Sequence, residues 1–286
     1  MSVRTIDLAY RRRKLVDATA RGLCIAASVA ALIPLAAVLL YVGEKGLSGL
    51  SWDFFTELPI PVGEVGGGMK HAIVGTLICV GIASAIGIPI GILAGVYLAE
   101  FGDNRLGTTV RFSADVMNGV PSITVGIFVY TLVVLSMGHF SALAGGIALS
   151  ILMIPTVMRT TEEMLRMVPA SLREAALALG APKRRAIVTV ALRTAASGIA
   201  TGVMLAVARV SGETAPLLFT ALGNDYYSTD ATKPIATLSV QIYTYAVSPY
   251  DDWHAKAWAA ALLLVTMILV LNLSARALVW SRGARR

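Results

Sequence analysis

Charged residues are scarce in this chain, where they make up 14% of 286 residues while hydrophobic residues make up 56%. Soluble domains carry about a quarter charged residues, so a water-soluble globular protein is excluded. Cysteine is scarcer still, and Cys24 and Cys79 both lie within apolar runs. This excludes a disulfide framework and a C-x-x-C site. The composition indicates an integral membrane protein.

Signatures of catalysis and of metal binding are also missing. Residues 102–109, GDNRLGTT, resemble a phosphate-binding loop, but Thr108 stands where such a loop needs its lysine. His71, His139 and His254 show no spacing typical of metal ligands. We therefore expect no catalytic residue, no metal site and no cofactor bound by this chain.

Apolar stretches long enough to cross a bilayer recur along the chain. One span needs about 20 mostly apolar residues. The candidate stretches are 22–43, 71–99, 116–158, 194–208 with a continuation to 220, and 257–275. The third holds two spans, separated by the turn-like residues 137–141. The sequence therefore predicts an all-α polytopic membrane protein with six transmembrane helices, the first of them too long for a cleaved signal peptide.

Two series of glycines repeat at every fourth position. Gly87, Gly91 and Gly95 lie in the second stretch, and Gly198 and Gly202 lie in the fifth. Small residues at this spacing allow helices to approach closely in a membrane. We interpret both series as sites of ordinary bundle packing.

The net charge of +7 follows a topological pattern. Six Lys or Arg residues precede residue 22, two lie in 99–112, seven in 159–193 and four after residue 275. The opposite segments hold only Lys45, Lys70, Lys233 and Lys256. By the positive-inside rule, both termini and segment 159–193 are predicted to be cytoplasmic. Nucleic acid is not an expected partner, because topology explains the basic residues and no basic stripe contains interleaved aromatic residues.

A polar interlude at residues 171–193 predicts a short, self-capped helix. Ser171 stands three residues before Glu174, which is the capping-box pattern. Gly180 suits the left-handed position after the last helical residue, and Pro182 prevents the helix from continuing. The spacing predicts a helix over 172–179 that is too short to be stable alone.

One face of this predicted helix is apolar. Its members follow the i, i+3, i+4, i+7 rule and are Leu172, Ala175, Ala176 and Leu179. A face of this kind needs a surface to pack on. We therefore interpret the helix as a docking element.

The fifth stretch contains Arg209 and Glu213 at a spacing that allows pairing along one helix face. A charge at the centre of a membrane helix costs about 2.5–3.5 kcal/mol, so such residues usually face the bundle interior. One interpretation is a polar patch on a substrate path, in which Arg209 attracts an anion. The other is a structural ion pair. Thr214, beside Glu213, belongs to the same candidate path.

Hydroxyl residues near the start of the third span allow two interpretations. Ser122 and Thr124 lie in GVPSIT at 119–124. They either line the path or bond back to their own helix.

With these residues identified, the chain resembles the membrane subunits of ABC importers. Their shared signature is Glu-Ala-Ala, three residues and then Gly, here Glu174-Ala175-Ala176 and Gly180. Arg193 stands where the general pattern ends in proline. Longer strings resemble the PstA-type permeases of bacterial phosphate importers, namely GVYLAE at 95–100, GVPSITVGIFVY at 119–130, RTTEEML at 159–165, SLREAALALGAPK at 171–183 and SGETAPLLFTAL at 211–222.

The resemblance implies a type I ABC importer permease fold in the cytoplasmic membrane. It implies an N-terminal tail at 1–21, a permease domain at 22–281 with a coupling helix at 171–181 in the cytoplasmic loop 159–193, and a C-terminal tail at 282–286. The expected function is ATP-driven import of inorganic phosphate. Permeation of another oxyanion such as sulfate, or stand-alone secondary transport, are the alternatives.

The resemblance also implies partners. An ATPase subunit dimer would bind ATP, a second permease of PstC type would complete the channel, and an external phosphate-binding protein would deliver the anion. The residues expected to couple this chain to the ATPase are Leu172, Arg173, Glu174, Ala175, Ala176, Leu179 and Gly180.

Overall fold

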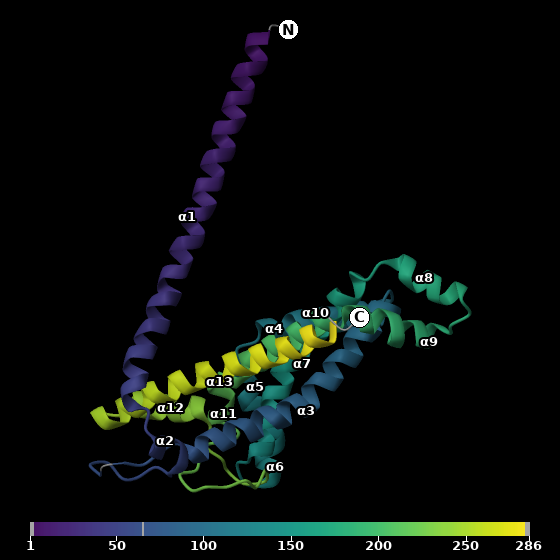
Figure 1. Ribbon diagram of the computed structural model, residues 1–286. Coiled ribbons are helices and arrows are strands. Elements are labelled where there is room, and N and C mark those ends of the chain that lie inside the picture. Colours follow the sequence, from purple (N-terminus) through teal and green to yellow (C-terminus); the bar gives the residue numbers. More distant parts are fainter. Residues whose placement is uncertain (1–2, 65, 284–286) are drawn as a thin grey trace.

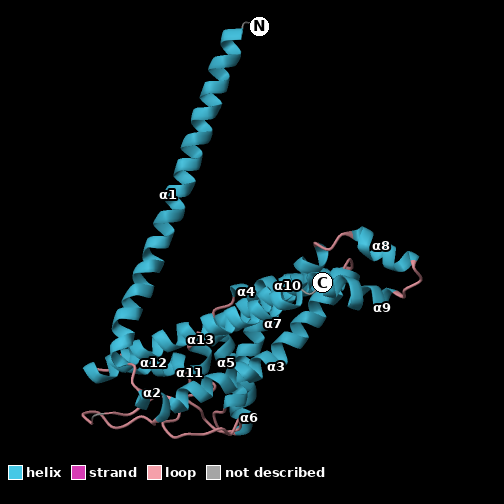
Figure 2. Cartoon of the chain, viewed as in Figure 1, coloured by secondary structure: helices cyan, strands magenta, loops and turns pink. Residues whose placement is uncertain are grey.

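The computed structural model describes residues 3–64 and 66–283, which form helices and loops and no strand (Figures 1 and 2). The long helices are α1 (Val3–Gly49), α3 (Lys70–Phe101), α7 (Ala142–Arg166), α10 (Leu192–Ser211) and α13 (Asp251–Gly283). Part of each expected tail, residues 1–2 and 284–286, lies outside the described residues. In the described chain, five helices are long and apolar enough to cross a membrane, and a bent pair makes a sixth.

The third span, which the sequence predicts to begin near residue 116, is a bent pair of helices that begins earlier in the chain. Helix α4 (Arg105–Gly119) meets α5 (Ser122–Val129) at 104°. Pro121 lacks an N–H, and the residue before a proline avoids the helical region, so Val120 is extended and the helix breaks there. Helix α5 continues through the π-helical turn η1 (Tyr130–Val134) into α6 (Leu135–Met137).

Helix α7 lies at the centre of the bundle, between α3 and α10. The glycines of α3 face it, since a Cβ on Gly91 would lie 2.7 Å from Cβ of Val157. Gly198 and Gly202 of α10 face Met164 and Thr160 of the same helix. The predicted role of both glycine series in close packing is confirmed, and both series pack against one helix.

The expected continuation of the fifth span to residue 220 is wrong. Helix α10 ends at Ser211, and a separate turn, α11 (Ala215–Leu218), follows. Pro216 of α11 packs against α5, because a Cβ on Gly126 would lie 2.7 Å from its Cα. The chain then forms a long loop and α12 (Leu238–Ala246).

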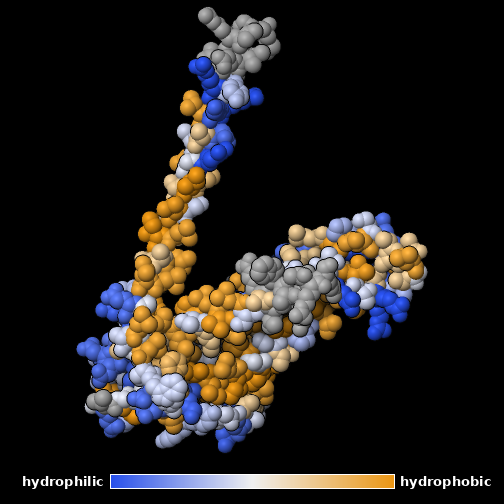
Figure 3. Space-filling model, in the orientation of Figure 1, coloured by the Kyte–Doolittle hydropathy of each residue, from blue (hydrophilic) through white to orange (hydrophobic). Residues whose placement is uncertain are grey.

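Helix α1 stands away from the bundle and contacts α13 only near its C-terminal end (Figure 1). Its contacts there include Tyr41, whose ring meets that of Trp258 edge to face at 5.1 Å. Residues 10–41 have exposed side chains, and the apolar ones form a band along the helix (Figure 3). The hydrophilic residues gather at the ends of α1 and of the bundle, as expected for a chain that crosses a bilayer.

The two ends of the bundle carry different elements. Short helices α2 (Trp52–Thr56) and α12 lie at one end. Helix α8 (Ala170–Ala178), which contains the predicted docking segment, protrudes from the other (Figure 1). It leads through α9 (Lys183–Arg185) and the π-helical turn η2 (Ala186–Ala191) into α10.

Candidate functional site

Helix α8 forms where the sequence predicts a helix, but it begins differently. Pro169 is its N-terminal flanking residue, and Ala170 is already helical. Ser171 therefore lies inside the first turn, and no capping box forms between Ser171 and Glu174. The capping box is thus a wrong prediction, because that pattern requires the serine to precede the helix.

The C-terminal end of α8 matches the expectation. Gly180 has φ +79°, the left-handed conformation that costs glycine little. The amide of Gly180 donates to the carbonyl of Leu177 at 2.9 Å, and the amide of Ala181 donates to that of Ala176 at 3.1 Å. These two bonds form a Schellman motif, which ends the helix and satisfies its last carbonyls.

Two faces of α8 differ in what they contact. Leu172 and Leu179 are 44% and 90% exposed, and Glu174 and Ala175 are exposed beside them. The structure thus leaves an apolar surface open to a partner. Ala176, expected on this face, is half-buried instead.

Arg173 points from α8 into the bundle. Its Nη2 donates to the carbonyl of Leu165, the penultimate residue of α7, at 2.5 Å. Its Nη1 lies 3.1 Å from a carboxylate oxygen of Glu100, whose side chain is 6% exposed. Arg173, which is one of the residues expected to couple this chain to the ATPase, therefore joins α8 to the ends of α3 and α7.

A second contact holds the end of α3 to the segment that follows α8. The ammonium group of Lys183 donates to the carbonyl of Glu100 at 3.3 Å. The same group lies 4.2 Å from the centre of the Phe101 ring, within the range of a cation–π interaction. The segment 167–185 is thus attached to the bundle once from within α8, through Arg173, and once after it, through Lys183.

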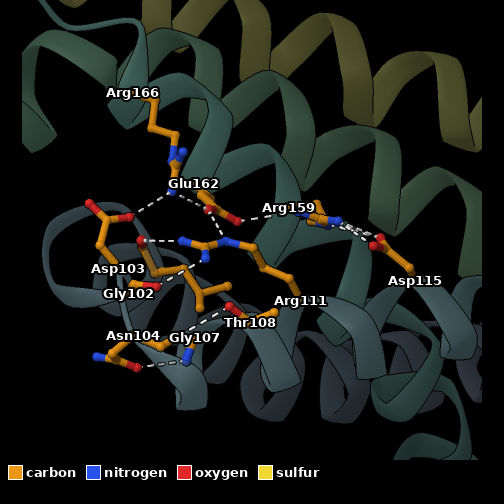
Figure 4. A network of polar contacts seen from close by, with 11 residues as sticks. Gly102, Asp103, Asn104, Gly107, Thr108, Arg111, Asp115, Arg159, Glu162 and Arg166 are labelled. Atoms are coloured by element: carbon orange, nitrogen blue, oxygen red, sulfur yellow. Dashed lines mark hydrogen bonds and ion pairs between the residues drawn. The ribbon is translucent and has the colours of Figure 1, made fainter.

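An ion cluster centred on the buried Glu162 lies next to this attachment (Figure 4). Glu162 of α7, with a side chain 3% exposed, accepts from Arg111 of α4 at 2.6 Å. Arg159 and Arg166 of α7 approach its carboxylate at 3.5 and 3.1 Å. Arg159 also forms a two-pronged ion pair with Asp115 of α4, in which Nε donates to Oδ1 at 3.0 Å and Nη2 donates to Oδ2 at 2.5 Å.

Arg111 extends the cluster to the α3–α4 turn. It donates to the carbonyls of Gly102 and Leu98 at 3.0 and 2.9 Å (Figure 4). In the same turn Asn104 caps α4 by accepting from the amide of Gly107 at 2.8 Å. The segment that resembles a phosphate-binding loop is therefore a helix cap held by a half-buried arginine.

This cluster was not predicted from the sequence. Its signal is the spacing of Arg159, Glu162 and Arg166 at i, i+3 and i+7, which places all three on one side of the C-terminal part of α7. The partner Arg111 lies 51 residues before Glu162 and is not visible from spacing.

The expected ion pair between Arg209 and Glu213 does not form. Arg209 belongs to α10, which ends at Ser211, whereas Glu213 follows the helix. Among the described residues, no acidic side chain lies within ion-pair distance of the exposed Arg209. The backbone carbonyl of Glu213 instead accepts from the hydroxyl of Ser239 at 2.9 Å. Thr214 also reaches this segment, donating to the carbonyl of Ser239 at 3.5 Å.

The depth of Arg209 follows from the antiparallel packing of α10 on α7. Because Gly202 lies against Thr160 and Gly198 lies against Met164, Arg209 lies near the level of Met153, halfway along α7. Arg209 therefore lies about halfway along the bundle, with its side chain exposed on α10.

The hydroxyls of α5 lie at a similar depth. Thr124 lines an apolar cavity of about 240 Å³ together with Leu152 of α7. Ser122 is half-buried, and within the described chain neither hydroxyl makes a hydrogen bond back to its helix. The structure does not bring Ser122 or Thr124 into contact with Arg209.

Comparisons with known proteins agree on one family. The family of binding-protein-dependent transport system inner membrane components matches residues 87–280. The chain is 48% identical over 277 residues to the phosphate transport system permease protein PstA of Yersinia pestis, an alignment that covers 96% of this chain and 93% of that protein. It is 37% identical over 270 residues to the phosphate transport system permease protein PstA 1 of Mycobacterium tuberculosis, covering 92% and 88% of the two chains.

The fold is similar to that of a solved ABC transporter. The MetNI methionine ABC transporter in an inward-facing conformation aligns with a TM-score of 0.64 over 74% of this chain and 95% of that one. The sequence identity is 20%, so this likeness concerns the fold alone.

Proposed function

This chain belongs to the family of binding-protein-dependent transport system inner membrane components, and we infer that it is the permease subunit of a bacterial importer for inorganic phosphate. The observation that carries this function is the 48% identity to a phosphate permease over 96% of the chain. A multi-pass protein of the cytoplasmic membrane follows from the family and from the apolar helices. Stand-alone secondary transport is not favoured.

We propose that the exposed face of α8 docks an ATPase subunit, which binds ATP in place of this chain. Leu172 and Leu179 present exposed apolar surface. The Schellman end of α8 keeps the helix formed before docking, and Arg173 transmits its movement to α3 and α7. ATP hydrolysis on the partner would thus reach the membrane helices through two short contacts.

The proposed orientation places α8 in the cytoplasm. Segment 159–193 carries seven Lys or Arg residues, and the N-terminal 21 residues carry six. The positive-inside rule then places both termini on the cytoplasmic side and α12 on the outer side. A second permease of PstC type and an external phosphate-binding protein would complete the importer.

We propose that Arg209 marks the anion path. An exposed guanidinium halfway along the bundle, with no described acidic partner, suits bidentate binding of a phosphate oxygen pair. Glu213 and Thr214 lie just after α10, and Ser122 and Thr124 lie at a comparable depth on α5. These residues are candidates for the walls of the same path.

Reconstituted uptake tests the function. Liposomes with this chain, its ATPase, a sister permease and the external binding protein are expected to accumulate labelled phosphate only with ATP. Competition by sulfate separates the two oxyanions, because a sulfate permease would lose most of its phosphate uptake at equal concentrations. Equal uptake with and without ATP would contradict an ABC importer.

A further inference from the structure

The outer end of the molecule contains a cavity that the proposed transport path does not use. It has a volume of about 570 Å³ and is formed by three segments that are far apart in the sequence. These are residues 58–61 before α3, residues 222–226 after α11, and the outer part of α12 together with Trp253 of α13.

The cavity combines one carboxylate with aromatic rings. Asp225 is the charged residue of its lining, which contains no lysine or arginine. Tyr226, Tyr245 and Trp253 supply the rings, and those of Tyr245 and Trp253 stack at 4.4 Å. Burial, and to a lesser extent the negative charge of Asp225, raises the pKa of Tyr245, so this phenol stays neutral. A carboxylate beside aromatic faces attracts a cation, because both the negative charge and the faces of the rings bind positive groups.

The carboxylate has no cation of its own in the described chain. Asp225 appears in no ion pair, whereas the lysines of nearby segments are engaged elsewhere. Lys233 pairs with Asp230 at 3.6 Å, and Lys70 lies 5.3 Å from the centre of the Tyr227 ring. The cavity is therefore negative and open to a positive group from outside.

The loop that carries Asp225 is held in place by its neighbours. Leu222 has φ +62°, a conformation that costs a branched side chain about 1–2 kcal/mol. Its amide donates to the carbonyl of Leu217 at 3.0 Å, and the amide group of Asn224 donates to the carbonyl of Pro234 at 3.3 Å. The carboxylate is thus presented by an ordered turn.

Charge on the surrounding surface has the same sign. Segments 44–70 and 222–256 together contain eight Asp or Glu residues and four Lys residues. Such a surface repels a free phosphate anion and attracts a basic protein surface. The occupant that fits is therefore a protein side chain that carries positive charge.

We propose that this cavity receives a basic side chain, an arginine above all, from the external binding protein when that protein docks. A guanidinium stacks on aromatic rings and forms two parallel hydrogen bonds with a carboxylate, which an ammonium group cannot do. This inference rests on the proposed function, and it makes Asp225 and Tyr226 the docking contacts of that same importer.

Charge reversal tests the proposal on the complete importer in nanodiscs. The measurement is the affinity of the phosphate-loaded binding protein, at low and at high salt. Asp225→Lys is expected to weaken binding more than about tenfold, since like charges then meet in the cavity. Asp251→Lys reverses an exposed carboxylate outside the lining and is expected to change binding less than about threefold.

Two tyrosine variants, one inside the cavity lining and one outside it, test the contribution of the aromatic rings to binding. Tyr226→Leu, at a side chain 80% exposed, is expected to weaken binding about two- to fivefold. Tyr243→Leu, at a side chain 51% exposed outside the lining, is expected to leave it unchanged. Basal ATP hydrolysis without binding protein should be the same in all four variants and in the wild-type importer.

Two outcomes overturn the proposal. If Asp225→Lys bound the binding protein with wild-type affinity, the cavity would not be a docking contact. If Asp225→Lys and Asp251→Lys lost affinity equally, the effect would be general surface electrostatics and not a contact in the cavity. Failure of the proposed function is a different result, because the wild-type importer would then take up no phosphate. An Arg→Glu exchange on the binding protein that restores affinity to Asp225→Lys would identify the partner side chain.

Discussion

Replacing Arg173 with alanine is expected to separate ATPase docking from transport. The Arg173 side chain contacts the ends of α3 and α7, whereas Leu172 and Leu179 are exposed. Arg173→Ala should therefore keep the docking surface and remove the connection behind it. ATP hydrolysis would continue, but the movement of α8 would no longer pull on α3 and α7.

The magnitude follows from the two contacts that are lost. Removing one residue of a buried ion pair costs about 3–5 kcal/mol of stability, because the remaining buried charge has no partner. Arg173 is 25% exposed, so water screens part of this interaction, and Lys183 lies near enough to Glu100 to replace part of the charge. We therefore expect Arg173→Ala to weaken the attachment of α8 to the bundle by about 2 kcal/mol. This loss of free energy raises the population of detached α8 about thirtyfold.

The assay is the ratio of phosphate imported to ATP hydrolysed in proteoliposomes. Arg173→Ala should lower this ratio several-fold while the ATPase still co-purifies with the permease. Arg173→Lys should recover part of it, since it keeps the charge but not both contacts. Arg184→Ala removes an exposed arginine of the same loop and serves as the matched control.

A double variant shows whether Arg173 and Glu100 act together. If the contact between Arg173 and Glu100 couples the two processes, the double variant Arg173→Ala, Glu100→Gln should have a transport ratio no lower than that of Arg173→Ala alone. A normal transport ratio in Arg173→Ala would refute the connection. Loss of the ATPase as complete as in a docking variant would refute the division of α8 into two faces.

Three further predictions concern docking, the anion path and packing. Replacing Leu172 and Leu179 with aspartate should leave the chain in the membrane but abolish co-purification of the ATPase, because charge then covers the apolar docking face; retained co-purification would contradict docking there. Arg209→Ala should reduce phosphate uptake more than Arg209→Lys without lowering the thermal midpoint, since no described ion pair is lost; normal uptake by Arg209→Ala would remove this residue from the path. Gly91→Ala should destabilise the chain by about 1–3 kcal/mol through its contact with α7, whereas Gly81→Ala, with open space at its Cβ, should not, as measured by thermal unfolding in detergent.

Local and periodic features of this chain could be predicted from its sequence. Apolar length predicts the spans, because a bilayer requires about 20 apolar residues whatever their neighbours are. Gly180 ends α8 as predicted, since the left-handed position is a local preference of glycine. The glycine repeats predict close packing because glycine has no side chain to hold neighbouring helices apart. The repeats do not identify α7 as the helix that they contact.

Predictions failed where two local signals competed. Ser171 has a capping-box partner at the right spacing, but the chain becomes helical at Ala170, directly after Pro169. The third span was expected to begin before Pro121, and the extended residue before that proline begins a new direction instead. Arg209 and Glu213 have a pairing distance in sequence that applies only within one continuous helix, and α10 ends between them.

By itself, the sequence determined that this protein is a helical membrane protein, which stretches are long and apolar enough to cross the bilayer, and which loop contains a short helix that ends at Gly180. These properties depend on hydrophobicity, helix geometry and charge over short stretches. Only the tertiary structure decided that Arg173 points inward, that Glu162 collects three arginines, and that Asp225 stands in an aromatic cavity. Each of those arrangements joins residues from separate elements, so packing of the whole chain decides which side chains meet.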